Sequence, residues 1–514
     1  MKASRFAIAM AAACGAIASA PSFAITASNY TNTGEFAGDS LNIRISGASA
    51  QDNGILGSAL SLCVAGSVHR YAISNNFVFY CTPDVGTNAG QIQIPARAAS
   101  SGGPITKLAI YKYSVGGSAF GVDPVNTNVV ADGSALGSTG NQLPFLDLSK
   151  INSVCTGALA TTTTATYGPG TNGSYVNVAC GNAASALATL STTFVGLSDV
   201  EPAFFSKNTN NLTPASASAL IFGPVVTKNV YDRLQTLQLL TTPSCGATLD
   251  SEGCMPSLTS AQIASLYTQP GQVWSTFGVT GLVNDAVYIA RRVDSSGTQK
   301  TFEALIAGSP NGQAGQKDCN AGTDLFAVPD SGNVTTGDAA AACTTGILIN
   351  GVNTVPTVFA GSSGGDVRIC LNNHNASSRS AIGILTTEDK AGSNNWRFIK
   401  VDGIAPNQAQ TAAGRYRFYT ETSVNTRTAG AFATANEPGY STFVSRFLAD
   451  FANPTIINQI NGAAQPYGAA GLMALLSRQP AGTAPDFSGA TPIVPWSKVV
   501  GTSVNNCQKP KLFN

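Results

Sequence analysis

The sequence has few charged residues and almost no histidine. Asp, Glu, Lys and Arg make up 11% of the 514 residues and the formal net charge is +1, whereas a typical soluble domain is about 25% charged. Without a Lys/Arg cluster, nucleic acid and anionic membrane surfaces are not expected partners. The histidines are His69 and His374, and no C-x-x-C, G-x-S-x-G, H-E-x-x-H or P-loop motif occurs. We therefore predict no metal site, no cofactor and no enzymatic activity.

Long apolar runs are also missing beyond the N-terminus. Residues 1–24 combine a basic start (MKASR), a short apolar run and the small-x-small pattern Ser22-Phe23-Ala24, which is typical of a signal peptide cleaved after Ala24. Cys14 leaves a lipoprotein anchor as an alternative. No later segment approaches the roughly 18 apolar residues of a membrane span. We expect a periplasmic or extracellular protein.

Cysteine is plentiful for an intracellular protein and suits an exported one. Removing Cys14 from the 11 cysteines leaves ten, and an even number in an exported chain indicates disulfides. Most of them form couples that are close in sequence. The predicted pairs are Cys63–Cys81, Cys155–Cys180, Cys245–Cys254, Cys319–Cys343 and, from the remainder, Cys370–Cys507.

Strands and helices alternate along most of the chain. Four apolar runs end in turns of small residues before a likely helix start: LNIRISGAS, KLAIYKYSVGGSAFG, TTFVGLSDVEP and AVYIARRVDSSGT. This alternation predicts an α/β fold with a largely parallel sheet, in which ligands bind beyond the carboxyl ends of the strands. The four turns are therefore expected to meet at one cleft. Three stretches rich in small residues, 125–180, 308–345 and 476–495, are interpreted as loop insertions.

The clearest helix signal begins at Thr259. Thr259 and Gln262 have the spacing of a capping box, and Ile263, Leu266 and Tyr267 form one apolar face. An ordinary packing helix is expected there.

The turn at 291–299, RRVDSSGTQ, concentrates charge and hydroxyl groups in a chain that is poor in charge. Ser296 is a candidate N-cap with Gln299 as its capping-box partner. Gly297, Thr298 and the free N–H groups beside them suit an oxyanion, with Arg292 as the bidentate cation and Asp294 holding that arginine. The alternative is a capped helix with a surface Arg–Asp pair.

Ser198 and Asp199 follow another apolar run. Asp199 either caps a helix or accepts a hydrogen bond from a ligand oxygen that keeps its proton. A carboxylate in an anion site repels a fully ionised anion, so the second reading favours hydrogenphosphate over sulfate.

Taken in order, these segments resemble the periplasmic phosphate-binding proteins, the solute receptors of ABC phosphate importers. RRVDSSGTQKTFEALI is similar to that family's Arg-Asp-Gly-Ser-Gly-Thr segment, and FVGLSDVEP to its strand ending in Ser-Asp. RISGASAQD, LTSAQIASLYTQPGQVWS and RFIKVDGIAPNQAQTAAGRYRFYTE resemble its first turn, a helix followed by tryptophan, and a late segment. The sequence departs from the family at Gln51 and Asp52, where threonine and an aromatic residue are usual, and at Ser295, which replaces a glycine.

The resemblance implies a two-lobed α/β fold of the type II periplasmic-binding class, with mixed, mostly parallel sheets and disulfide-bonded loop insertions. The first lobe would comprise residues 25–222 plus 402–514, and the second residues 223–401. The resemblance places ligand-binding roles on Arg292, Asp294, Ser296, Gly297, Thr298, Asp199, Ser198, Ser118, Ala50 and Gln51.

The implied function is reversible capture of phosphate or a similar oxyanion between the lobes of a monomer, for import through an ABC permease. One alternative is an extracellular or cell-surface interaction protein that keeps the fold without the ligand. A second is a phosphatase-like hydrolase that uses the same pocket, which the scarcity of histidine disfavours.

Overall fold

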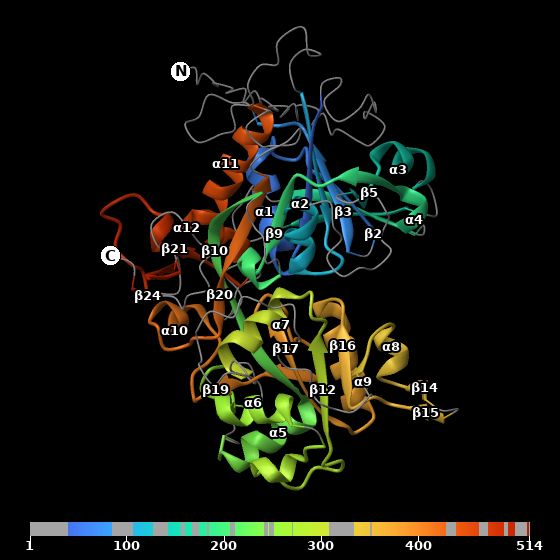
Figure 1. The fold of residues 1–514 in the computed structure, drawn as a ribbon, viewed down its shortest axis with the longest axis vertical. Coiled ribbons are helices and arrows are strands. Elements are labelled where there is room, and N and C mark those ends of the chain that lie inside the picture. The colour runs from blue at the N-terminus through green and yellow to red at the C-terminus, as the bar shows by residue number, and fades with distance from the viewer. Residues whose placement is uncertain are drawn as a thin grey trace, which may run out of the picture.

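The computed structural model describes the chain in segments, and the residues predicted to form the signal peptide lie outside them. Figure 1 shows two lobes stacked along the long axis of the molecule. The described residues are 40–73, 75–84, 106–126, 142–155, 160–166, 174–181, 184–205, 211–240, 245, 251–269, 271–307, 334–349, 352–427, 438–461, 471–487, 492–498 and 511–512.

The first lobe is built on a mixed sheet with the strand order β9-β1-β4-β3-β2-β7-β6. Its centre is parallel, since β1 pairs in parallel with both β4 and β9, so three strands end at one edge. Leu41, Ile43 and Ile45 of β1 are buried. The elements are β1 (Ser40–Gly47), α1 (Asp52–Leu62), β2 (His69–Ile73), β3 (Asn76–Cys81), β4 (Lys107–Tyr113), α2 (Asp123–Asn126), β5 (Gln142–Leu146), α3 (Leu148–Val154), β6 (Ala160–Thr166), β7 (Ser174–Cys180), α4 (Ala184–Leu187), β8 (Ala188–Thr192) and β9 (Val195–Ser198), with 3-10 helices at Ser49–Gln51, Ser118–Gly121 and Pro202–Phe204.

The second lobe has the strand order β13-β16-β12-β17, and β12 pairs in parallel with β16 and β17. The predicted helix is confirmed: the Thr259 hydroxyl accepts from the Gln262 N–H, and Ile263 is buried. The elements are α5 (Lys228–Leu237), β11 (Ser257–Leu258), α6 (Ser260–Thr268), β12 (Val287–Arg292), α7 (Gly297–Phe302), β13 (Val334–Thr335), α8 (Ala339–Ala342), β14 (Ile347–Ile349), β15 (Val352–Thr354), β16 (Val358–Gly361), α9 (Gly364–Ala376), β17 (Ser380–Thr386), β18 (Trp396–Phe398) and β19 (Lys400–Val401), with a 3-10 helix at Trp274–Phe277 and a π-helix at Glu303–Ala307. The next helix in the chain is α10 (Gln408–Ala412).

Two long antiparallel strands join the lobes. The first part of β10 (Leu212–Thr227) pairs with β20 (Tyr419–Arg427), and its last part pairs with β17 and β18 of the second lobe. Figure 1 shows both strands passing between the upper and lower lobes. The α/β class with two lobes and mixed, mostly parallel sheets is therefore confirmed.

The C-terminal part of the chain returns to the first lobe. The Ser58 hydroxyl of α1 donates to Asp450 at 2.9 Å, and Phe443, Phe447 and Phe451 are spaced four apart and fully buried. This spacing puts the three rings on one helix face. The elements are α11 (Pro438–Ala452), α12 (Pro454–Asn461), β21 (Leu472–Leu475), β22 (Ile493–Val494), β23 (Trp496–Ser497) and β24 (Lys511–Leu512), with a 3-10 helix at Leu476–Arg478.

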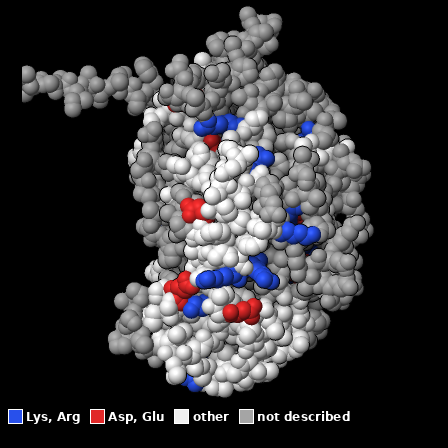
Figure 2. All heavy atoms as spheres, turned by 90° about the vertical axis from the view of Figure 1, so that its left-hand side faces the viewer, with Lys and Arg blue, Asp and Glu red and all other residues white. Residues whose placement is uncertain are grey.

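Charge is sparse on the surface as well as in the sequence. On the face shown in Figure 2, Lys and Arg side chains lie near Asp and Glu, among many uncharged side chains. Within the described residues, no helix has the length and apolar composition needed to cross a bilayer.

Three of the five predicted disulfides are confirmed. They are Cys63–Cys81, Cys155–Cys180 and Cys245–Cys254. The second of these lies in the predicted insertion 125–180, where it ties the end of α3 to the end of β7.

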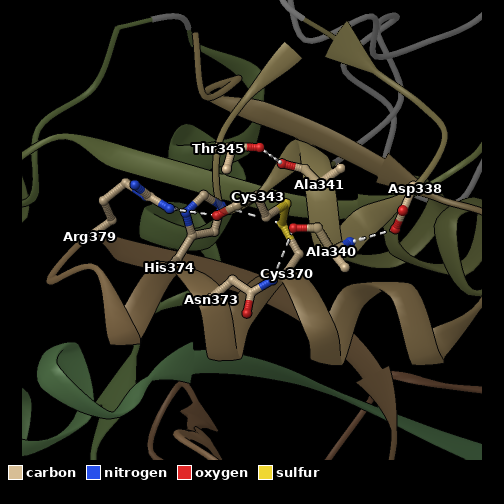
Figure 3. The surroundings of a disulfide bond; sticks show 9 residues. All are labelled: Asp338, Ala340, Ala341, Cys343, Thr345, Cys370, Asn373, His374 and Arg379. Atoms are coloured by element: carbon tan, nitrogen blue, oxygen red, sulfur yellow. Dashed lines mark hydrogen bonds between the residues drawn. A yellow bond between two sulfur atoms is a disulfide. The ribbon is translucent and has the colours of Figure 1, made fainter. Parts of the chain in front are cut away.

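The predicted pairs Cys319–Cys343 and Cys370–Cys507 are wrong, because Cys343 is bonded to Cys370. Figure 3 shows this bond between the end of α8 and the middle of α9. The two Cα atoms are 5.1 Å apart, within normal disulfide reach. Cys343 is almost equally far in sequence from Cys319 and Cys370, so sequence distance does not identify its partner. The packing of α8 on α9 determines that Cys343 pairs with Cys370. Cys319 and Cys507 lie outside the described residues.

Peptide mapping checks this correction. We expect a non-reduced digest with trypsin and a protease that cleaves at aspartate to contain a peptide pair joining Cys343 to Cys370. Asp324, Asp330 and Asp338 separate Cys319 from Cys343, so the two pairings give different masses. A pair joining Cys319 to Cys343 would contradict the structure, and the same digest after reduction is the control.

Candidate functional site

Arg291 and Arg292 end strand β12 on opposite faces, because successive strand residues alternate. Arg291 forms an ion pair with Asp294 at 2.9 Å. The Arg292 guanidinium instead donates to the carbonyl oxygens of Gly361 at 3.2 Å and Ser362 at 2.8 Å. The prediction that Asp294 holds Arg292 is therefore wrong. Arg292 is 6% exposed, and the described residues give it no ion-pair partner.

The helix after this turn begins at Gly297, as expected, but its predicted capping box does not form. Ser296 occupies the N-cap position without a side-chain cap bond, and the Gln299 amide donates to Glu303 at 3.2 Å instead. The hydroxyl oxygens of Ser296 and Thr298 are buried and have no hydrogen-bond partner among the described residues. Of the two residues, Thr298 lines the cleft cavity described below and Ser296 does not.

The turns after β4 and β9 meet the turn after β12, so the lobes touch directly. The backbone N–H of Asp199 donates to the Ser118 hydroxyl at 2.9 Å, and the N–H of Ala119 donates to the Ser295 carbonyl across the cleft at 3.0 Å. A Cβ atom on Gly297 would lie 2.3 Å from the Ser118 hydroxyl oxygen. Only glycine allows this approach.

The turn after β1 completes the group. The Gln51 side chain is fully buried, and its amide nitrogen donates to Asp199 at 3.3 Å. Its amide oxygen is buried without a partner among the described residues. Burial raises the pKa of Asp199, while the Gln51 hydrogen bond and the charge of Arg292 act against that shift. All four turns that the sequence singles out therefore meet.

Ser198 and Ala50 were also predicted to bind the ligand. The Ser198 hydroxyl donates to the Val200 carbonyl at 2.5 Å, so it stabilises the turn in which it lies. Ala50 lines the cleft cavity with its neighbours.

The sequence did not predict a buried ion pair that lies next to the turns after β1 and β4. Lys112 of β4 is 0% exposed; its ammonium lies 3.2 Å from Asp52 and donates to the Gly47 carbonyl at 2.8 Å and the Ser114 hydroxyl at 2.7 Å. Burial is the largest influence on both partners and raises the pKa of Asp52 while lowering that of Lys112. A lysine inside the apolar run KLAIYKYS was the available signal.

A cavity of about 290 Å³ opens between the lobes beside these turns. Arg292 and Thr298 line it from the second lobe and Asp52 from the first. The sequence did not single out its further charged residues Arg368, Glu388, Asp389 and Lys390. The full lining is Ser49, Ala50, Asp52, Asn53, Asn75, Arg292, Thr298, Ser363, Gly364, Gly365, Arg368, Ile384, Leu385, Thr386, Glu388, Asp389 and Lys390.

The two histidines lie outside this lining. His69 sits in β2 beside Tyr71. His374 is fully buried next to the disulfide in Figure 3, where it accepts from Arg379 at 3.0 Å; burial and the Arg379 charge lower its pKa to about 3. Side-chain atoms of Cys343, Cys370 and His374 lie within 4.8 Å of one another, but the disulfide leaves no thiolate to bind a metal.

The arrangement suits reversible binding of a small anion. Arg292 offers a charge and Thr298 a hydroxyl to the cavity, whereas Ser296, Asp199 and Gln51 are not among its lining residues.

No protein-family model and no curated protein sequence matches the chain. Solved structures with a similar course of the chain include a putative phosphate ABC transporter substrate-binding protein with bound phosphate from Clostridium perfringens (TM-score 0.31, 14% identity, covering 52% of this chain and 77% of that one). An ABC-type phosphate transport receptor from Vibrio cholerae has a TM-score of 0.30 and 14% identity, covering 52% of this chain and 78% of that one. A possible phosphate binding protein from Planctomyces limnophilus has a TM-score of 0.26 and 10% identity, covering 49% and 69%. The similarity is a distant one of fold.

Proposed function

We propose that this protein is an exported solute-binding protein that captures phosphate, or an oxyanion of similar shape, between its two lobes. The observation that carries the proposal is a set of three buried oxygens, from Gln51, Ser296 and Thr298, on turns beside the buried Arg292. None of the three has a hydrogen-bond partner in the described part of the chain. An unsatisfied buried polar group costs about 1–3 kcal/mol. A ligand that bonds these oxygens and the guanidinium removes that cost.

On binding, protein groups replace the water molecules around the anion. Arg292 supplies the charge, the hydroxyls of Ser296 and Thr298 donate, and the contact of Ser118 with Gly297 holds the lobes together around the ligand. The hinge runs through β10 and through the return of the chain near residue 402, and an ABC permease receives the loaded monomer. No bond of the ligand is broken.

Asp199 gives the site its preference among oxyanions. Its carboxylate is 3% exposed and accepts a hydrogen bond from a ligand that keeps a proton, whereas it repels a fully ionised anion. Hydrogenphosphate meets this requirement and sulfate does not. We therefore place Asp199 and the Gln51 amide oxygen at the protonated oxygen of phosphate.

Calorimetry on refolded, phosphate-stripped protein tests the proposal. We expect phosphate to bind between about pH 5 and pH 8, and sulfate to bind at least about 100-fold more weakly. In Asp199→Asn the phosphate preference should shrink, because the amide no longer repels sulfate. The control is Asp232→Asn, which removes an equal charge from an exposed pair on α5.

Absence of phosphate heat at every pH would refute this function. It would favour an extracellular interaction protein that keeps the fold without the ligand. The hydrogen bond from the Ala119 N–H to the Ser295 carbonyl across the cleft supports this second candidate, since it joins the lobes through the protein backbone itself.

A further inference from the structure

The charges that line the cleft cavity fall into two pairs and a remainder. Arg368 forms an ion pair with Asp389, and Asp52 forms one with Lys112 behind the cavity wall. Each of these four charges therefore has an opposite charge in contact, and a ligand gains least from them.

The remainder is Arg292, Glu388 and Lys390. Among the described residues, the Arg292 guanidinium donates only to backbone carbonyls. The Glu388 carboxylate bonds only neutral groups, the Asn53 amide at 3.1 Å and the Thr386 hydroxyl at 3.2 Å. Neither has an ion-pair partner among the described residues. Lys390 lies at the exposed rim, where water screens its charge.

Glu388 faces a second carboxylate across the cleft. Asp52 begins α1 of the first lobe, Glu388 follows β17 of the second, and both line the cavity. Burial, followed by the charge of Asp52, raises the pKa of Glu388 well above its usual range. The second carboxylate disfavours the charged form of Glu388, and a cationic group beside Glu388 favours that form.

The cavity is also larger than one oxyanion needs. Its volume of about 290 Å³ corresponds to roughly ten water molecules at their liquid density. An anion of five heavy atoms at Arg292 and Thr298 leaves room towards Glu388.

From this pairing of charges we infer that the ligand is a small phosphate ester that also carries a protonated amine. Its phosphate lies at Arg292 and Thr298, and its ammonium lies at Glu388. This inference rests on the proposed function and narrows it from a bare anion to a zwitterion.

Calorimetry with O-phosphoethanolamine and ethyl phosphate tests it, since the two probes differ in the amine alone. We expect the wild-type protein to bind O-phosphoethanolamine at least about tenfold more tightly. In Glu388→Gln the ratio should fall below about threefold, because an amide cannot form an ion pair with the ammonium. Asp232→Asn should keep the wild-type ratio.

The outcomes distinguish a failure of this inference from a failure of the proposed function. Equal binding of the two esters by the wild-type protein overturns the zwitterion while leaving phosphate capture intact, and this comparison needs no variant. A wild-type preference that survives unchanged in Glu388→Gln also overturns the assignment of the ammonium. If ethyl phosphate, O-phosphoethanolamine and inorganic phosphate all fail to bind, both proposals fail.

Discussion

Arg292→Ala should lower phosphate affinity by about 100-fold or more, roughly 3 kcal/mol. The guanidinium is 6% exposed, so its charge acts on a ligand with little screening by water. Its removal also takes away one of the two cations, with Lys112, whose charge acts on the Asp199 carboxylate. Calorimetry on stripped protein measures the loss.

Arg291→Ala is the matched control for that experiment. It removes the same charge one residue earlier on β12, from the opposite face, where Arg291 pairs with Asp294 and lies close enough to Tyr267 for its charge to act on the phenol. We expect phosphate affinity within about threefold of wild type. Equal losses in the two variants would mean that general electrostatics, rather than a contact with Arg292, governs binding.

The sequence predicts the convergence of the four turns but not the partners within it. Strand-to-turn patterns around Gln51, Ser118, Asp199 and Arg292 are local, and parallel strands bring their carboxyl ends together whatever lies between them. Asp294 pairs with Arg291 rather than Arg292 because successive residues at the end of β12 point to opposite faces. The sequence motif alone does not show this alternation.

The sequence did not predict contacts between residues on segments that are far apart in the chain. Glu388 belongs to TTEDK, a short polar run after an apolar strand, and resembles any surface turn in sequence. Only the approach of the second lobe to α1 puts it opposite Asp52. The Cys343–Cys370 bond has the same cause, because helix packing rather than sequence distance decides it.

Gly297→Ala should keep the lobes from closing on phosphate. The added Cβ would lie 2.3 Å from the Ser118 hydroxyl oxygen and 2.7 Å from the Asp199 Cβ, closer than non-bonded atoms approach. Alanine is the better helix former by about 1 kcal/mol, so any loss comes from the contact between the lobes rather than from α7. Small-angle X-ray scattering should show phosphate compacting the wild-type protein but not the variant.

Gly253→Ala is the control, because a Cβ there meets no atom within 4 Å. It should compact with phosphate as the wild type does. If Gly297→Ala also compacts fully, Ser118 and Asp199 do not meet Gly297 in the closed state. If the wild-type protein is equally compact with and without phosphate while Gly297→Ala is expanded in both, the Gly297 contact is a permanent bond between the lobes. Closure would then owe nothing to an anion, and the interaction protein without a ligand would be the better account of this cleft.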